Sequence, residues 1–355
     1  MFASAVPSAV PHVLSHIPDP GLTYEEVLDQ VTKRADLALP DQVLPLSQLH
    51  ATSEGAVEVP GLGQLGLNPW SRRQLANLLG IRWDRWFASE AIVPADRAEE
   101  INRRFRASGE TWKIRARRPA TDEMPGDYSV LRAFVSPTYA PIDDLQVFET
   151  LDRVLAGQLD GIRFVRMDVT AQSSQYAAVS LAEVDLGVGK SDRHRNGFLL
   201  ANSEVGSRSL TFLAWIWRLV CTNGMVAPES RLLRLIHRSR KEGVLQARFA
   251  EAVKLLPESW KRTETVLRRA RQDRESDPGM ALQVLVESHS ELRPIAETVY
   301  DAYEADPEPN RFGIVQALTR AAQGLTPERR LEVEELAGLV AAGAPMPSVR
   351  EEVSF

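Results

Sequence analysis

The stretch Ile162–Ala171, IRFVRMDVTA, decides the fold. Its apolar residues alternate with Arg163, Arg166 and Asp168, apart from a slip near Val165. Because successive side chains of a strand point to opposite faces, this period of two predicts a strand with one buried face. The short links to the segments that follow favour antiparallel pairing in one sheet. Further strands are expected at Tyr176–Leu186, Gly197–Asn202 and Ser209–Cys221.

Helices and two more strands are expected on the N-terminal side of this sheet. Apolar residues recur at helical spacing over Thr23–Leu37, which predicts a first helix. Asn68 followed by Pro69 is a typical helix start, and the helix is expected to end at Gly80. The remaining predictions are short strands or loops at Leu39–Val59, a short helix with Trp83, Trp86 and Phe87, a helix at Ala95–Ala107, strands at Trp112–Arg118 and Tyr128–Val135, and a helix from Pro141 through Leu155.

From Ser230 onward the sequence predicts helices, over 230–255, 258–275, 280–305, 311–323 and 327–342. The fold class is therefore α+β, with a central antiparallel sheet between helical N-terminal and C-terminal regions. Residues 1–60 are predicted to be an irregular arm with one helix, and residues 61–227 a mixed α/β core that holds the sheet. Residues 228–343 form the helical region, and residues 344–355 a loose tail.

The net charge of −6 hides an uneven distribution along the chain. Residues 1–70 carry −6 and residues 276–355 carry −8, which leaves +8 for the middle. The overall charge argues against a nucleic-acid binder, whereas its distribution permits one.

Cysteine content and hydropathy indicate a soluble cytoplasmic protein. The single cysteine, Cys221, excludes an internal disulfide and a multi-cysteine metal site. No apolar run approaches the length of about 18 residues that a membrane-spanning helix needs. Residues 1–21 contain no Lys or Arg and are interrupted by prolines, so we interpret them as an arm and not as a secretory signal.

Three groups of basic residues in the middle of the chain are the candidate nucleic-acid contacts. The first lies on the strand Trp112–Arg118, the second in an expected hairpin tip, and the third as one stripe on the helix predicted from Ser230. A row of fixed cations can follow phosphates, although a solvated helix face or a solubilising loop explains the same residues. The groups are Lys113, Arg115, Arg117 and Arg118; Lys190, Arg193, His194 and Arg195; and Arg231, Arg234, Arg238 and Lys241.

Other chemical signals in the sequence are weaker. Trp215 and Trp217 share one face of their strand, where packing in a core or subunit interface is favoured over the stacking of bases. Glu183, Asp185, Asp192 and His194 could gather around a metal, but their spacing matches no known ligand set. We therefore predict no catalytic residue, no metal site and no cofactor.

Three stretches of the chain resemble a known family. They are residues 65–87, LGLNPWSRRQLANLLGIRWDRWF; residues 132–144, RAFVSPTYAPIDD; and residues 202–225, NSEVGSRSLTFLAWIWRLVCTNGM. Through them the chain is similar to the phage/plasmid-like family called domain of unknown function 932. A weaker match at Phe312–Gly338 has Gln316 where the family usually has Asn. The resemblance implies a mobile-element or DNA-maintenance context and assigns no catalytic residue; the order of elements is also similar to phage single-strand annealing proteins.

Three functions are compatible with these observations. The first is a non-enzymatic, annealing-like protein of DNA recombination that prefers single-stranded DNA and acts as a homo-oligomer. The second is a self-assembly module in which the acidic C-terminal helices of one subunit pair with the basic middle of the next, without nucleic acid. The third is a metal-dependent nuclease that uses Glu183, Asp185 and Asp192.

Overall fold

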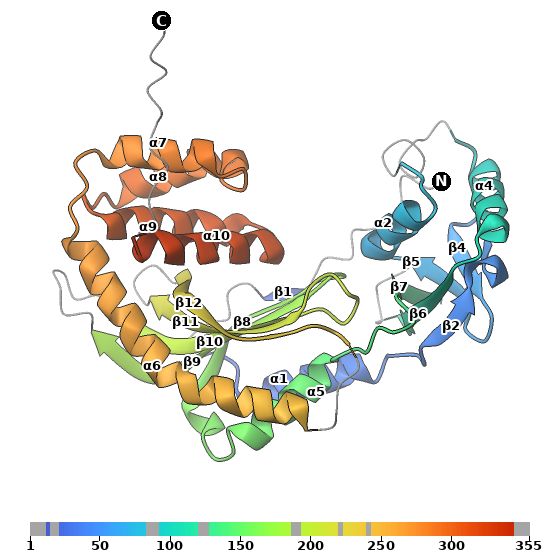
Figure 1. The fold of residues 1–355 in the computed structure, drawn as a ribbon, viewed down its shortest axis with the longest axis horizontal. Helices are drawn as coiled ribbons and strands as arrows, with labels where there is room; N and C mark the ends of the chain where they lie inside the picture. Colours follow the sequence, from blue (N-terminus) through green and yellow to red (C-terminus); the bar gives the residue numbers. More distant parts are fainter. Residues whose placement is uncertain are drawn as a thin grey trace, which may run out of the picture.

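The structure is a computed structural model of the chain, and it describes residues 12–14, 21–82, 92–119, 128–185, 193–218, 223–238 and 243–343. Over these residues the chain forms two lobes, each built around its own six-stranded sheet (Figure 1). The α+β class predicted from the sequence is confirmed. The expected short helix with Trp83, Trp86 and Phe87 lies outside the described residues, as does the tail 344–355.

Sheet A, in the larger lobe, is antiparallel throughout and has the order β1-β8-β9-β10-β11-β12. The slip near Val165 is a shift of register between Phe164 and Arg166, where an extra residue bends the strand. The four strands predicted between residues 162 and 221 are therefore confirmed. The strands are β1 (His12–Leu14), β8 (Ile162–Val169), β9 (Ser174–Asp185), β10 (Arg193–Asn202), β11 (Leu210–Arg218) and β12 (Asn223–Leu235).

Sheet B, in the smaller lobe, was not expected as a separate sheet. It has the order β2-β6-β7-β5-β4-β3, and its pair β5–β7 is parallel. The sequence predicted one central sheet because four of these strands are only two to five residues long and show little alternation. The strands are β2 (Gln42–Pro45), β3 (His50–Ala51), β4 (Ala56–Val59), β5 (Gly63–Leu67), β6 (Thr111–Arg117) and β7 (Ser129–Val135).

The helix predicted from Ser230 is wrong at its start, because β12 continues to Leu235. Phe212 of β11 lies opposite Leu233, whereas the next residue, Leu213, lies opposite Arg231. One extra residue of β12 is therefore accommodated there as a bulge. The bulge leaves Arg231 and Arg234 exposed three residues apart, which imitates the period of a helix. Pairing with β11 makes this segment a strand, and such a tertiary effect cannot be predicted from local periodicity.

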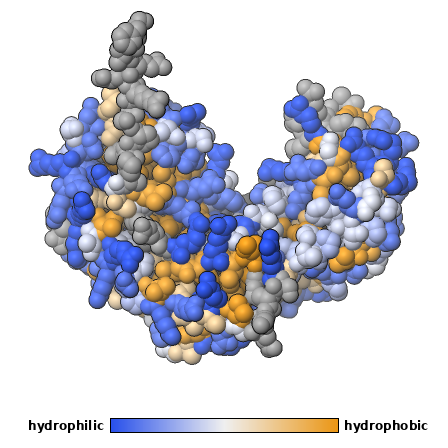
Figure 2. All heavy atoms as spheres, viewed as in Figure 1, coloured by the Kyte–Doolittle hydropathy of each residue, from blue (hydrophilic) through white to orange (hydrophobic). Residues whose placement is uncertain are grey.

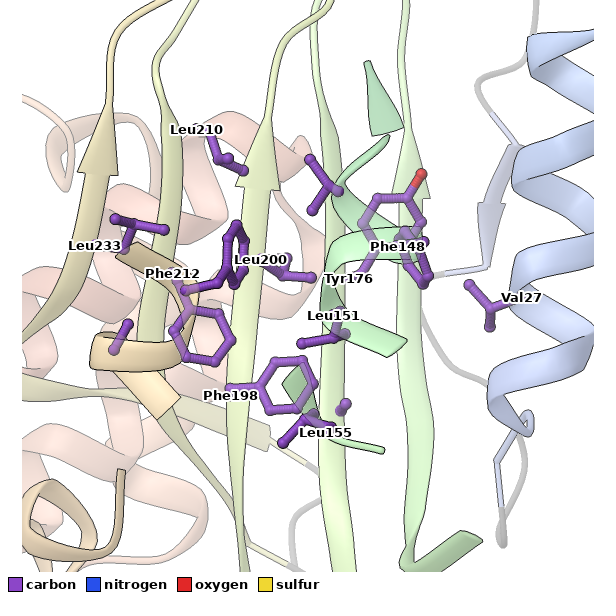
Figure 3. Close-up of a cluster of buried hydrophobic side chains, with 14 of the residues drawn as sticks. Val27, Phe148, Leu151, Leu155, Tyr176, Phe198, Leu200, Leu210, Phe212 and Leu233 are labelled. Atoms are coloured by element: carbon purple, nitrogen blue, oxygen red, sulfur yellow. The ribbon is translucent and has the colours of Figure 1, made fainter. Parts of the chain in front are cut away.

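Three helices cover one face of sheet A: α1 (Tyr24–Ala35), α5 (Asp144–Val154) and α6 (Val244–Gln272) (Figure 1). Their apolar side chains and those of the strands form the main core, in which rings of Phe148, Tyr176, Phe198 and Phe212 succeed one another across the strands (Figure 3). The sequence predicted a break near Pro257, but α6 continues through this exposed proline. Burial of one apolar face against the sheet holds the helix together there.

The other face of sheet A is covered by the C-terminal bundle of α7 (Pro278–Ser288), α8 (Ala296–Ala305), α9 (Arg311–Ala321) and α10 (Pro327–Ala341). The helix predicted over 280–305 is therefore two helices, and those at 311–323 and 327–342 are confirmed. Trp215 and Trp217 are buried on this face, as the core reading predicted. None of the described helices is long and apolar enough to cross a membrane.

A buried network of four charged side chains docks α10 onto β8. Arg166 forms two hydrogen bonds to Glu334, from Nη1 to Oε1 at 2.6 Å and from Nη2 to Oε2 at 3.1 Å. Asp168 accepts a hydrogen bond from Arg330 at 3.1 Å and lies 3.6 Å from the Nε of Arg166. Two cations and two anions thus balance inside the protein, where an unpaired charge would be costly.

The smaller lobe consists of sheet B with α2 (Pro69–Leu78) and α4 (Pro94–Ala107). The predicted start of α2 is confirmed, because the side chain of Asn68 accepts a hydrogen bond from the backbone N–H of Ser71 at 2.8 Å. Trp70 donates from Nε1 to the carbonyl oxygen of Val205 in the larger lobe, at 3.3 Å. A hollow separates the two lobes on the side shown in the space-filling view (Figure 2).

Candidate nucleic-acid interface

The first predicted basic group, on β6, is largely used inside the protein. Arg115 is 5% exposed and donates two hydrogen bonds to Asp143, at 2.9 and 3.1 Å, and one to Asp41 at 3.1 Å. Lys113 donates to the carbonyl oxygen of Tyr139, and Arg118 donates to that of Asp36. Of the group, which also includes the half-buried Arg117, only Arg118 is well exposed. These side chains stabilise the junction between the lobes and do not form a basic face.

The second group divides between paired residues and residues outside the described ranges. Arg193 is exposed and lies 3.0 Å from Glu183. Arg195 is nearly buried and lies 3.4 Å from the same carboxylate, and His194 is 2% exposed. The two arginines lower the pKa of Glu183, mainly through hydrogen bonds from Arg193. Lys190 lies outside the described residues.

The third group lies on the edge strand β12 and the residues after it, not on a helix. Arg234, Ile236 and Arg238 are exposed and alternate with the buried residues Leu233 and His237. Arg231, 49% exposed, is 3.1 Å from Glu335 of α10, and Arg234 donates to the hydroxyl of Ser209 at 3.2 Å. At about 3.3 Å per residue, Arg231 and Arg238 are about 23 Å apart. Lys241 lies outside the described residues.

A fourth basic surface, which sequence reasoning missed, lies on α6. Lys254, Lys261 and Arg268 recur every seven residues, and Arg262 and Arg269 follow the last two by one position. All five side chains are exposed. At 100° per residue they occupy about 120° of the helix circumference, over a length of about 22 Å. We call them the α6 stripe. The seven-residue recurrence could have revealed it, but the predicted break near Pro257 divided the pattern.

Acidic residues only partly neutralise the α6 stripe. Glu258 is 3.0 Å from Arg262, and Asp273 is 3.8 Å from Arg269. In the described part of the chain, no carboxylate lies within ion-pair distance of Lys254 or Lys261. The stripe therefore retains a net positive charge along four turns of helix.

The acids proposed for a nuclease do not assemble into a metal site within the described residues. Glu183 is occupied by Arg193 and Arg195, and Asp192 lies outside the described ranges. The described residues offer no group of three or more His, Cys, Asp or Glu side chains suited to holding a metal ion.

A buried polar cluster forms where α5 begins, and two of its members, Asp144 and Asn202, belong to the family-like stretches. Asp144 accepts hydrogen bonds from Ser174 at 2.9 Å, Tyr176 at 2.7 Å and Asn202 at 2.8 Å. Arg34 of α1 lies 3.6 Å from the same carboxylate. Burial raises the pKa of Asp144, and the nearby charge of Glu204 raises it further. Both oxygens of Asp144 are engaged by neighbours, which is the state of a structural carboxylate.

Glu204, in the turn between β10 and β11, connects this cluster to sheet B. It accepts hydrogen bonds from Arg132 of β7 at 2.5 Å and from the backbone N–H of Asp144 at 2.9 Å. Its carbonyl oxygen accepts one from Arg115. Burial alone would raise the pKa of Glu204, but Arg132 and these hydrogen bonds outweigh it and hold the pKa at about 2. We call Arg115, Arg132, Asp143, Asp144 and Glu204 the interlobe joint.

Four of the five residues of the interlobe joint come from two of the three family-like stretches, 132–144 and 202–225, which lie far apart in the sequence. A model of the family described as "Domain of unknown function (DUF932)" matches residues 132–305. Residues 132–305 belong to this family. No curated protein and no solved structure matches the chain.

The DUF932 segment begins at Arg132 and contains β8 to β12 and α5 to α8. It therefore includes the α6 stripe and the exposed arginines of β12. Sequence reasoning assigned Arg115 to nucleic-acid contact and gave the other four joint residues no functional role, although the motifs themselves were the available signal. The contacts of the joint residues connect the two sheets, which gives these motifs a structural role.

Proposed function

We propose that this DUF932 protein binds single-stranded nucleic acid without catalysing a reaction, in the manner of an annealing protein, and does so as a homo-oligomer. The α6 stripe carries the proposal, because it places five exposed cations along about 22 Å of rigid helix. Fixed cations gain affinity for a phosphate backbone by releasing its counterions. The exposed arginines at 231, 234 and 238 supply a second row.

The preference for a single strand follows from the arrangement of the two rows. α6 crosses the strands of sheet A at an angle, so the two rows are not collinear (Figure 1). A flexible strand can follow both rows, whereas duplex DNA is stiff over about 150 base pairs. Trp215 and Trp217 are buried and do not stack on bases. Binding is therefore directed at the backbone and tolerant of sequence.

The test compares single- and double-stranded oligonucleotides by fluorescence anisotropy across salt concentrations. For single strands, the logarithm of affinity falls with the logarithm of salt by about 0.7 for each phosphate contact. The triple variant K254A/K261A/R268A should reduce this slope by about 2 and weaken binding. A matched control, K33A/R103A/R153A, removes three exposed cations from other helices and should leave the slope unchanged. Salt-insensitive binding, or equal slopes for both variants, contradicts the proposal.

One observation favours a second candidate function, charge-driven assembly between copies of the chain. Glu297, Asp301 and Glu304 are exposed on one face of α8, at spacings of four and three residues. This acidic face could pair with the α6 stripe of another copy. Light scattering separates the two candidates: assembly through these faces decreases as salt rises and is lost in E297K/D301K/E304K. Combining that variant with K254E/K261E/R268E should restore it.

A further inference from the structure

The smaller lobe contains a pocket that the proposed function does not use. It lies between the β3–β4 hairpin, α2 and α4, and its empty volume is about 450 Å³ including the open mouth. Apolar walls come from residues such as Val57, Leu75 and Ile101. The polar lining includes Arg72, Arg97 and Thr52, and among the described residues that line the pocket there is no Asp or Glu.

The two arginines occupy equivalent positions in their helices. α2 and α4 each begin with proline, and each carries its arginine as the fourth helical residue. Side chains on a helix lean toward its N-terminus, which directs both arginines toward the first turn of their helices. That end of a helix already carries a partial positive charge. The first turn of α2 contains no acidic residue to offset it.

The two arginines line the same pocket, and their like charges repel each other. Burial lowers the pKa of Arg72, and the charge of Arg97 lowers it further. Burial also lowers the pKa of Arg97, which is 2% exposed and donates from Nη2 to the carbonyl oxygen of Ile92 at 3.2 Å. Among the described residues, the side chain of Arg72 has no hydrogen-bond or ion-pair partner. Two like charges in one pocket favour an anion between them.

We propose that this pocket binds a phosphate monoester, either as a free small molecule or as the 5′ end of a nucleic acid. Such a group carries about −1.5 to −2 at pH 7, which matches two arginines. The planar guanidinium fork also fits phosphate oxygens in pairs. Thr52 adds a hydroxyl at the same wall. The site is separate from the α6 stripe, so it does not depend on the function proposed above.

Calorimetry at constant ionic strength tests the site with two small probes, inorganic phosphate and adenosine 5′-monophosphate. R72A should weaken binding at least tenfold. R73A is the matched control, because Arg73 is the next residue of α2, is exposed and does not line the pocket. R72K keeps the charge but loses the fork, and should be intermediate. No saturable binding to the wild type, or equal binding by R72A and R73A, overturns the proposal.

Two further measurements identify the source of the phosphate and guard against a folding defect. Phosphate should raise the melting temperature of the wild type and R73A, but not of R72A. R72A itself should melt no lower than the wild type without phosphate, because it removes a repulsion. An oligonucleotide with a 5′-phosphate should bind more tightly than its 5′-hydroxyl twin if the ligand is a nucleic-acid end, and equally if it is a free small molecule. Measuring both oligonucleotides with the K254A/K261A/R268A variant separates the effect of the 5′-phosphate from binding to the α6 stripe.

Discussion

Breaking the Arg166–Glu334 pair should destabilise the protein strongly, whereas replacing both partners should not. Each side chain is 2% exposed, and the two hydrogen bonds between them are 2.6 and 3.1 Å long. Glu334→Leu leaves two buried cations facing Asp168 alone, and Arg166→Met leaves an excess of buried negative charge. Losing one partner of a buried pair costs about 3–5 kcal/mol. We expect each single variant to lose that amount in free energy of unfolding.

The double variant R166M/E334L removes one positive and one negative charge and leaves the Arg330–Asp168 pair, 3.1 Å apart, in balance. Apolar replacement of a buried pair is commonly neutral or stabilising. If the double variant lies within about 1 kcal/mol of the wild type, the coupling energy of the cycle is at least about 5 kcal/mol. The exposed pair of Arg103 and Glu100 is the control, with an expected effect below about 1 kcal/mol.

Urea unfolding monitored by tryptophan fluorescence measures this cycle. The guanidinium of Arg166 lies 5.4 Å from the centre of the Trp215 ring, so the signal includes the docking site of α10 itself. The reasoning is refuted if the double variant loses as much stability as the two single variants together. That result would mean that packing, and not charge, sets the cost.

Three other predictions concern packing, pH and exposed charge. Gly224→Ala places a Cβ 1.8 Å from a ring carbon of Trp215, so the melting temperature should fall by an amount equivalent to about 1–3 kcal/mol or more, whereas Gly109→Ala, with open space around it, should be neutral. Because the pKa of Glu204 is held at about 2, its contribution is complete above about pH 4.5 and is lost as the pH falls toward 2. Glu204→Gln should therefore flatten the decline of stability between pH 5 and 3, even though it also removes one of the charges that raise the pKa of Asp144; an unchanged decline contradicts the assignment. Arg193→Ala should change the unfolding free energy by less than about 1 kcal/mol in urea titrations, since its pair with Glu183 is exposed.

Local patterns predicted the elements that bury one face along a regular period. β8, β9 and α1 follow from alternation or helical spacing, and α2 follows from Asn68 and Pro69. Sheet B could not be predicted as a separate sheet, because four of its strands are short and one pair is parallel. The bulge in β12 depends on its pairing with β11 and gives a strand the period of a helix.

The candidate sites could be predicted only where the exposure of a basic side chain follows from the local sequence pattern. Arg115 and Arg231 are equivalent basic residues in the sequence, but one is buried against Asp143 and the other is half exposed beside Glu335. The acids that pair with them come from other elements. The pocket of Arg72 and Arg97 requires two helices to converge, although each helix start shows the same proline and arginine spacing.

The pairing of β1 with β8 has a consequence for the order in which the chain folds during synthesis. Leu14 lies opposite Met167, about 150 residues later, whereas all strands of sheet B fall between residues 42 and 135. At roughly 5–20 residues per second, a ribosome needs about 8–30 s to make the residues between Leu14 and Met167. Sheet B can close within that interval. The apolar face of α1, with Val27 and Val31, stays without its partners until α5 and then sheet A emerge, so this early helix is buried only after sheet B can close.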